Sequence, residues 1–429
     1  MLSLFILLFA FSFLWSVNQR LKGRFLTPSG LLLTVYLLCS VGTLYLYRYD
    51  EVVLDPLATT YYVVALGTLL LPVVMFDETH SVTTDANDTE IEVYISYFLV
   101  VVGVFSVAYN FSDMASALNG DLDENRRWTT SEANQVVTIP SVLAAYAAYL
   151  FSLMVPLGFY WLATRRRSLL GTALLAGSCS YLVFVLRHVG RDVLVMWGSA
   201  FAFNMLLFWR NLSGITKVIM LVGYSVALLI LGVLFLLITS DRFSTEKTGY
   251  IYPYANYAGQ SPVHFSEHFL ASRPLGYGQL NFNIVYRLGA LAELTEYNRY
   301  FTEDAVAYTM SSENYFLNVF SSIVGSFFQD FGKYGTVLFV ACLGIVMCVT
   351  LGRGGRRLPL WQVIIYTMYM QVMLGGAFYY FYYHNVGNCA LAFSVGTAVA
   401  IKYARGYRRK LEISEAFARE RNGGVTTAL

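Results

Sequence analysis

The sequence predicts an all-α protein whose helices cross a lipid bilayer about eleven times. Of the 429 residues, 57% are hydrophobic and only 13% are charged, about half the charged share of a soluble domain. The mean hydropathy is +0.54. In lipid, every backbone polar group must be bonded within the protein, and apolar segments close to 20 residues long satisfy this requirement as helices.

Eleven apolar segments have about the length that a bilayer requires. They lie near residues 2–17, 30–47, 57–76, 93–111, 139–163, 168–186, 193–209, 218–238, 334–351, 360–382 and 385–402. The predicted organisation is therefore eight spans in 1–238, one large external loop at 239–333, three spans in 334–403 and a basic tail at 404–429.

Basic residues predict the orientation of these spans. Arg20, Lys22 and Arg24 follow the first apolar segment instead of preceding it, which indicates a retained helix and not a signal peptide. Further basic groups occupy alternate connections near 165–167, 210–217, 353–357 and 402–410. The positive-inside rule then places the N-terminus outside and the C-terminus in the cytoplasm. The acidic 77–92 connection fits this pattern less well, although carboxylates contribute little to topology.

The centres of the predicted spans contain no Asp, Glu, Lys or Arg. Ion-coupled carriers keep such residues within the membrane because they move charge across it, so their absence favours an enzyme acting at one membrane face. The 29 basic and 27 acidic residues leave a net charge of +2, which indicates no nucleic-acid partner. The five cysteines all lie in apolar segments and suggest neither a disulfide framework nor a metal site.

A short external corner, Arg187-His188-Val-Gly-Arg191-Asp192, joins two predicted spans. The guanidinium group binds phosphate oxygens through two donors and keeps its charge, so Arg187 and Arg191 are candidate ligands for a lipid diphosphate. The alternative is that both arginines only reach the phosphates of ordinary lipids.

The 239–333 loop is too long for an ordinary connection and too rich in tyrosine for a disordered one. Within it, Phe282–Leu294 has apolar residues at helical spacing and is predicted to lie at the membrane interface or over the end of the bundle. Arg287 in this stretch is a further candidate diphosphate ligand or an interfacial anchor. The candidate glycan-binding residues, whose rings could stack on sugars, are Tyr257, Tyr277 and Tyr286.

The same loop contains His264-Phe-Ser-Glu267-His268, which matches a zinc-binding pattern with two histidines on one helical face. With no third ligand identifiable, we predict no metal here. The two other interpretations are a solvated helix face and a catalytic group. In the second, His264, Glu267 or His268 contacts sugar hydroxyls or accepts a proton.

The segment from Asn318 to Gly335 leads into the ninth predicted span. Gly332 and Gly335 allow a tight turn or close helix packing, and Asp330 is suited to capping a helix. The stretch N-V-F-S at 318–321 followed by D-F-G-K-Y-G at 330–335 resembles the oligosaccharide repeat-unit polymerases, the O-antigen polymerase family. Gly190-Arg191 at a helix start and the late large loop are also similar to that family.

The resemblance implies chain growth on the outer face of the bacterial cytoplasmic membrane, without a cofactor. A glycan on polyprenyl diphosphate would be transferred to the next lipid-linked repeat unit, and a flippase and a chain-length regulator would be partners. The related O-antigen ligases usually have a His-plus-polar motif that His268-Phe269 matches poorly. A ligase-type transferase and a lipid-linked sugar flippase remain the alternatives.

Overall fold

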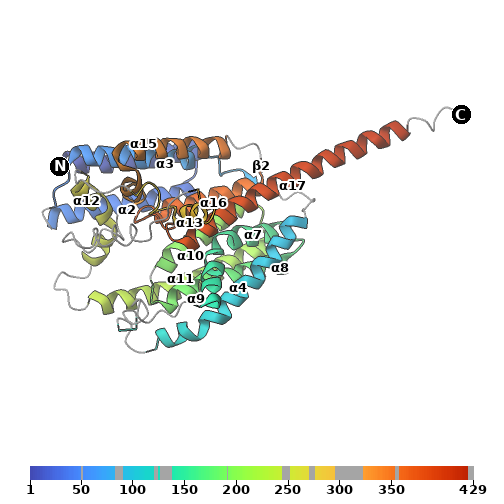
Figure 1. Ribbon diagram of the computed structural model, residues 1–429, viewed down its shortest axis with the longest axis horizontal. Helices are drawn as coiled ribbons and strands as arrows, with labels where there is room; N and C mark the ends of the chain where they lie inside the picture. Colours follow the sequence, from blue (N-terminus) through green and yellow to red (C-terminus); the bar gives the residue numbers. More distant parts are fainter. Residues whose placement is uncertain are drawn as a thin grey trace.

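The computed structural model describes residues 1–49, 52–82, 90–119, 124–125, 138–190, 192–243, 252–269, 276–294, 322–352 and 357–423. This part of the chain is a bundle of long helices with one short strand pair, β1 (Ser81–Val82) and β2 (Arg357–Leu358) (Figure 1). The helices are α1 (Leu2–Lys22), α2 (Pro28–Tyr49), α3 (Pro56–Met75), α4 (Glu90–Ala117), α6 (Ile139–Tyr149), α7 (Phe151–Thr164), α8 (Ser168–Ser178), α9 (Ser180–Arg187), α10 (Asp192–Phe208), α11 (Gly214–Phe243), α12 (Tyr252–His268), α13 (Asn283–Leu291), α15 (Ser322–Leu351), α16 (Leu360–Gly375) and α17 (Asn385–Gly423).

Eight of the described helical segments are long and apolar enough to cross a membrane. The pair α6 and α7, bent by 48° at Leu150, makes nine if it is counted as one span. The predicted helical membrane protein is therefore confirmed, while the predicted number of eleven is not reached. The shortfall has a simple reason, because α10 and α16 contain only 17 and 16 residues.

Helix α7 lies in the interior of the bundle, with every residue from Phe151 to Ala163 buried. At the other extreme, only 11% of the apolar window of α11 is buried inside the protein. A helix that is apolar on all sides yet exposed to its surroundings requires lipid around it.

Helix α15 has a sharp kink at Gly332, whose φ of 64° and ψ of −172° are accessible essentially only to glycine. This confirms the predicted tight turn. The helix begins at Ser322, so the first part of α15 lies within the stretch that the sequence assigned to the large loop. Helix α17 likewise continues beyond the predicted span at 385–402 and protrudes from the bundle as a helix through the predicted tail (Figure 1).

Connections that the sequence assigned to the cytoplasm lie together at one end of the bundle. Strand β1 pairs in parallel with β2, so residues 81–82 of the acidic connection lie beside residues 357–358 of the basic one. Arg210 donates a hydrogen bond to the Thr79 carbonyl oxygen at 2.7 Å. Glu78 accepts hydrogen bonds from Ser29 and from the Tyr366 hydroxyl, and its burial raises the pKa of this carboxyl. The N-terminus and α12 lie at the opposite end (Figure 1).

A labelling experiment tests which end faces outward. In a variant lacking the five native cysteines, we expect Tyr277→Cys to react with a membrane-impermeant thiol reagent in intact spheroplasts, and Ser168→Cys to react only after lysis. Both positions are exposed, so accessibility is decided by the side of the membrane. The reverse labelling pattern would overturn the predicted orientation.

Candidate functional site

Tyrosines gather around Asp192 at the end of the bundle that carries α12. The Tyr181 hydroxyl donates a hydrogen bond to Asp192 Oδ2 at 2.7 Å. The Tyr149 ring packs edge-on against Tyr181, with 5.7 Å between ring centroids. Burial and the negative charge of Asp192 raise the pKa of Tyr379, and Tyr149 and Tyr257 also lie close enough to Tyr379 for electrostatic interaction. A carboxylate thus lies within a wall of aromatic hydroxyls.

Tyr379 belongs to the connection at 376–384, which the sequence analysis had assigned in large part to a membrane span. Helix α16 ends at Gly375 because the following residues bond elsewhere. The Ser322 and Ile323 amides at the start of α15 donate to the Phe378 and Gly376 carbonyl oxygens, at 2.6 and 2.9 Å. These bonds hold the tyrosine-rich connection between α15 and the beginning of α17.

Asp330 anchors the 276–294 segment to α15. The carboxylate accepts hydrogen bonds from the Leu280 and Asn281 amides at 3.1 and 2.9 Å, and the Asn281 side chain donates to the Ser326 carbonyl oxygen at 2.8 Å. Its hydrogen bonds therefore tie a loop to the helix, in place of the helix cap that the sequence suggested. The Asn388 side chain of α17 donates to the Asn281 carbonyl oxygen at 3.0 Å and joins the same assembly.

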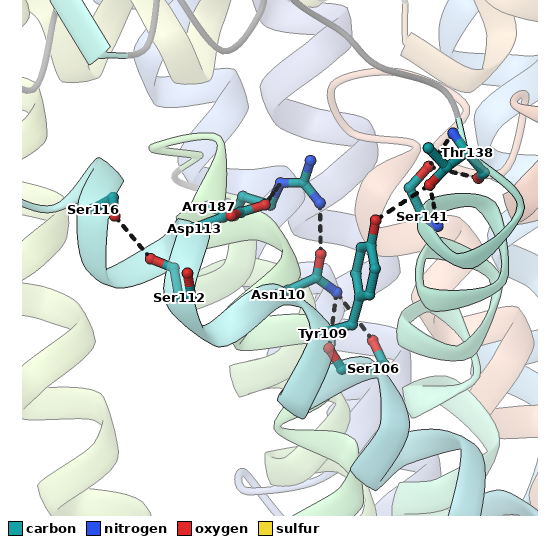
Figure 2. Close-up of polar contacts among 9 residues, drawn as sticks. All are labelled: Ser106, Tyr109, Asn110, Ser112, Asp113, Ser116, Thr138, Ser141 and Arg187. Atoms are coloured by element: carbon teal, nitrogen blue, oxygen red, sulfur yellow. Dashed lines mark hydrogen bonds and ion pairs between the residues drawn. The ribbon is translucent and has the colours of Figure 1, made fainter.

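The arginine corner is fixed to α4. Arg187 donates through Nη1 to Asn110 Oδ1 at 2.7 Å, and its Nε lies 3.2 Å from Asp113 Oδ2 (Figure 2). Asn110 is held in turn by the Ser106 carbonyl oxygen. Arg187 therefore has a countercharge just beyond the predicted span at 93–111, and its guanidinium is oriented by protein contacts. The Arg191 side chain lies outside the described residues.

The structure separates the predicted glycan-binding tyrosines. Tyr257 on α12 is a neighbour of Tyr379 and belongs with the Asp192 cluster. Tyr277 is 68% exposed, and the Tyr286 hydroxyl donates to the Tyr277 carbonyl oxygen. These two residues bond to each other along the 276–294 segment.

The remaining predicted residues also differ in position. Arg287 on α13 lies close enough to the Tyr146 hydroxyl of α6 for electrostatic interaction. His264 Nδ1 lies 3.5 Å from Glu267 Oε2 on α12. The His268 side chain and Asn318 lie outside the described residues. Helix α13 has no buried residue and exposes Val285, Leu288 and Leu291, as expected for a helix at the membrane interface.

The groups at the centre of this cluster were not among the site residues predicted from the sequence. Asp192 was visible only as the last residue of the arginine corner, and Tyr149 and Tyr181 lie within predicted spans. The run Phe-Tyr-Tyr-Phe-Tyr-Tyr-His at 378–384 was the available signal, since so many hydroxyls in an apolar segment suggest an interface.

Among the described residues, no group of three or more His, Cys, Asp or Glu side chains is arranged to hold a metal ion. Comparisons with protein-family models, curated proteins and solved structures find no match to this chain. The function is therefore inferred from the chemistry of the site.

Proposed function

We propose that the protein polymerises lipid-linked oligosaccharide repeat units at the outer face of a bacterial cytoplasmic membrane. The observation that carries this proposal is the Asp192 carboxylate within a tyrosine wall, beside an arginine corner, at one end of a membrane bundle. The charged residues of the described spans lie near helix ends, beside the kink of α15 or, in α17, after the apolar stretch that precedes Lys402. Such an arrangement suits a reaction on lipid-linked substrates at the interface better than charge transport.

The proposed reaction needs a proton acceptor and a cation for the leaving group. The acceptor hydroxyl oxygen forms a bond to the anomeric carbon of the donor glycan, and the bond from that carbon to the diphosphate breaks. Asp192 takes the hydroxyl proton, and polyprenyl diphosphate leaves with the electron pair, stabilised by arginine without a metal. Arg191 precedes Asp192 in the chain, so we prefer Asp192 to His264, Glu267 and His268 as the proton acceptor.

Two further arginines contribute to binding of the diphosphate. Arg187, oriented by Asn110 and Asp113, and Arg287 on the interfacial α13 supply positive charge to the diphosphate. The substrates are polyprenyl-diphosphate-linked oligosaccharides held at lipid level. A flippase that delivers repeat units and a chain-length regulator are the partners that such a reaction requires.

The test is a reconstituted assay in which the purified protein in vesicles receives lipid-linked repeat units. We expect the wild type to form a ladder of glycan lengths. Asp192→Asn and Arg191→Ala should each lower the rate of chain extension roughly a hundredfold or more, because each removes a group that stabilises the transition state. Arg191→Lys should remain impaired, since an ammonium group cannot reproduce the two-donor geometry.

Arg24→Ala is the matched control, because this exposed arginine lies at the opposite end of the bundle. It should leave the ladder unchanged. A normal ladder from Asp192→Asn at normal protein level would remove Asp192 from the site, and transfer of one finished chain to a different acceptor would indicate a ligase.

A further inference from the structure

Helix α12 has one polar face. The side chains along it, at helical spacing, are Asn256, Gln260, His264 and Glu267. The other faces pack against neighbouring helices. Gly259 meets the backbone of Gly42 on α2, and the Phe265 ring lies 5.8 Å from the Tyr61 ring on α3, between centroids. The position of α12 is thus determined without its polar face.

Two side chains on this face are buried with unused hydrogen-bonding atoms. Gln260 is 7% exposed and His264 is 9% exposed. Within the described part of the chain, Gln260 Oε1 and His264 Nε2 are buried and make no hydrogen bond, whereas Gln260 Nε2 donates to Asn256 Oδ1 and His264 Nδ1 lies 3.5 Å from Glu267 Oε2. Buried polar atoms without a partner destabilise the folded state, and native proteins contain few of them. Two such side chains one helical turn apart indicate that something else bonds to them.

The hydrogen-bonding capacity of these atoms restricts the ligand. Gln260 Oε1 only accepts, and with the Nδ1 proton of a neutral imidazole directed at the Glu267 carboxylate, His264 Nε2 also accepts. The ligand must therefore donate at two points. A phosphate dianion offers only acceptors, and the described residues hold no group of three or more His, Cys, Asp or Glu side chains for a metal ion, whereas sugar hydroxyls donate.

An aromatic wall borders the same part of α12. Tyr257 precedes His264 by two helical turns, so both lie on one side of the helix. Tyr257 and Asp192 both lie within electrostatic range of Tyr379. Ser261 Oγ lies 3.5 Å from the Phe378 carbonyl oxygen, which places α12 beside the tyrosine-rich connection. A sugar on α12 would therefore be next to the proposed catalytic carboxylate.

We propose that Tyr257, Gln260 and His264 form a subsite for a neutral sugar of the acceptor glycan, bound through its hydroxyl groups. The inference rests on the proposed polymerase function and adds the position of the acceptor. The donor is held by its diphosphate at the corner between α9 and α10, so the separate α12 face belongs to the acceptor.

The subsite can be tested by binding alone, with the repeat-unit oligosaccharide released from its lipid as the probe. Titration calorimetry on the full-length protein in nanodiscs would give its Kd. Gln260→Leu and His264→Leu should each raise the Kd about tenfold, which corresponds to the loss of a hydrogen bond. Each variant also removes a contact within α12, that of Gln260 with Asn256 or of His264 with Glu267, so its melting temperature is measured together with its Kd.

Ser266→Ala is the matched control on the packing side of α12. The Ser266 hydroxyl oxygen accepts a hydrogen bond from the Asp55 amide at 2.7 Å, so this variant should melt lower and bind the oligosaccharide normally. Unchanged affinity in both leucine variants would overturn the subsite even if the wild type forms a ladder. A further outcome is that the wild type forms no ladder, while both leucine variants bind the oligosaccharide more weakly than the wild type does. In that case the polymerase proposal fails and the glycan subsite stands.

Discussion

Replacing Arg405 by alanine should destabilise the protein by about 3–5 kcal/mol, because it leaves a buried carboxylate without its countercharge. Arg405 Nε on α17 lies 2.6 Å from Glu92 Oε1 on α4, and its Nη2 donates to the Tyr160 hydroxyl on α7 at 2.7 Å. The Glu92 side chain is fully buried. The measurement is the free energy of unfolding by denaturing detergent, compared with the wild type.

Two further variants separate the ion pair from helix packing. The double variant Glu92→Leu with Arg405→Met removes both charges and should regain most of the lost stability. Arg408→Ala, one turn later in the same helix, breaks a half-exposed contact of 3.4 Å with Glu412 and should cost less than about 1 kcal/mol. Equal losses for Arg405→Ala and Arg408→Ala would contradict the assignment of a buried ion pair.

Replacing Asp330 by alanine should release the 276–294 segment from the bundle. The change leaves the Leu280 and Asn281 amides and the Asn281 side chain without their acceptor. Each donor left unbonded in a buried position costs about 1–3 kcal/mol. We therefore expect early proteolytic cleavage within 276–294 under conditions that leave the wild type intact, together with loss of chain extension.

A substitution of Gly276 tests the same contact from the side of the 276–294 segment. In Gly276→Ala the added Cβ would collide with Asp330 Oδ1, so this variant should be cleaved like Asp330→Ala. Gly214→Ala is the control, since an added Cβ there meets nothing within 4 Å. Resistance of both Asp330→Ala and Gly276→Ala to the protease would show that the segment is anchored elsewhere.

The sequence identified most helices because their apolar composition is a local property. Its errors fall where tertiary contacts compete with that signal. Ser322 and Ile323 bond to the 376–384 connection, so α16 ends before the apolar segment does, and α15 begins before its apolar segment starts. The kink of α15 was foreseeable from Gly332, since only glycine adopts that backbone conformation without strain.

Only part of the candidate site could be predicted from the sequence. Arginines and histidines attract attention because their chemistry is evident from residue type, and the sequence selected Arg187 and His264 in this way. It could not show that Asn110 and Asp113 hold Arg187, because their helices meet only in the fold. Tyr149, Tyr181 and Tyr379 resemble ordinary interfacial tyrosines until the structure places them around Asp192.

Residue type and order are enough to predict a helical membrane protein whose predicted span centres lack charges, because hydropathy and charge act residue by residue against the bilayer. Which polar groups come together depends on the packed fold. Contacts such as Asp330 with Asn281, or Glu92 with Arg405, join residues 49 and 313 positions apart. Geometry at that separation depends on how whole helices pack, and no local pattern in the sequence encodes it.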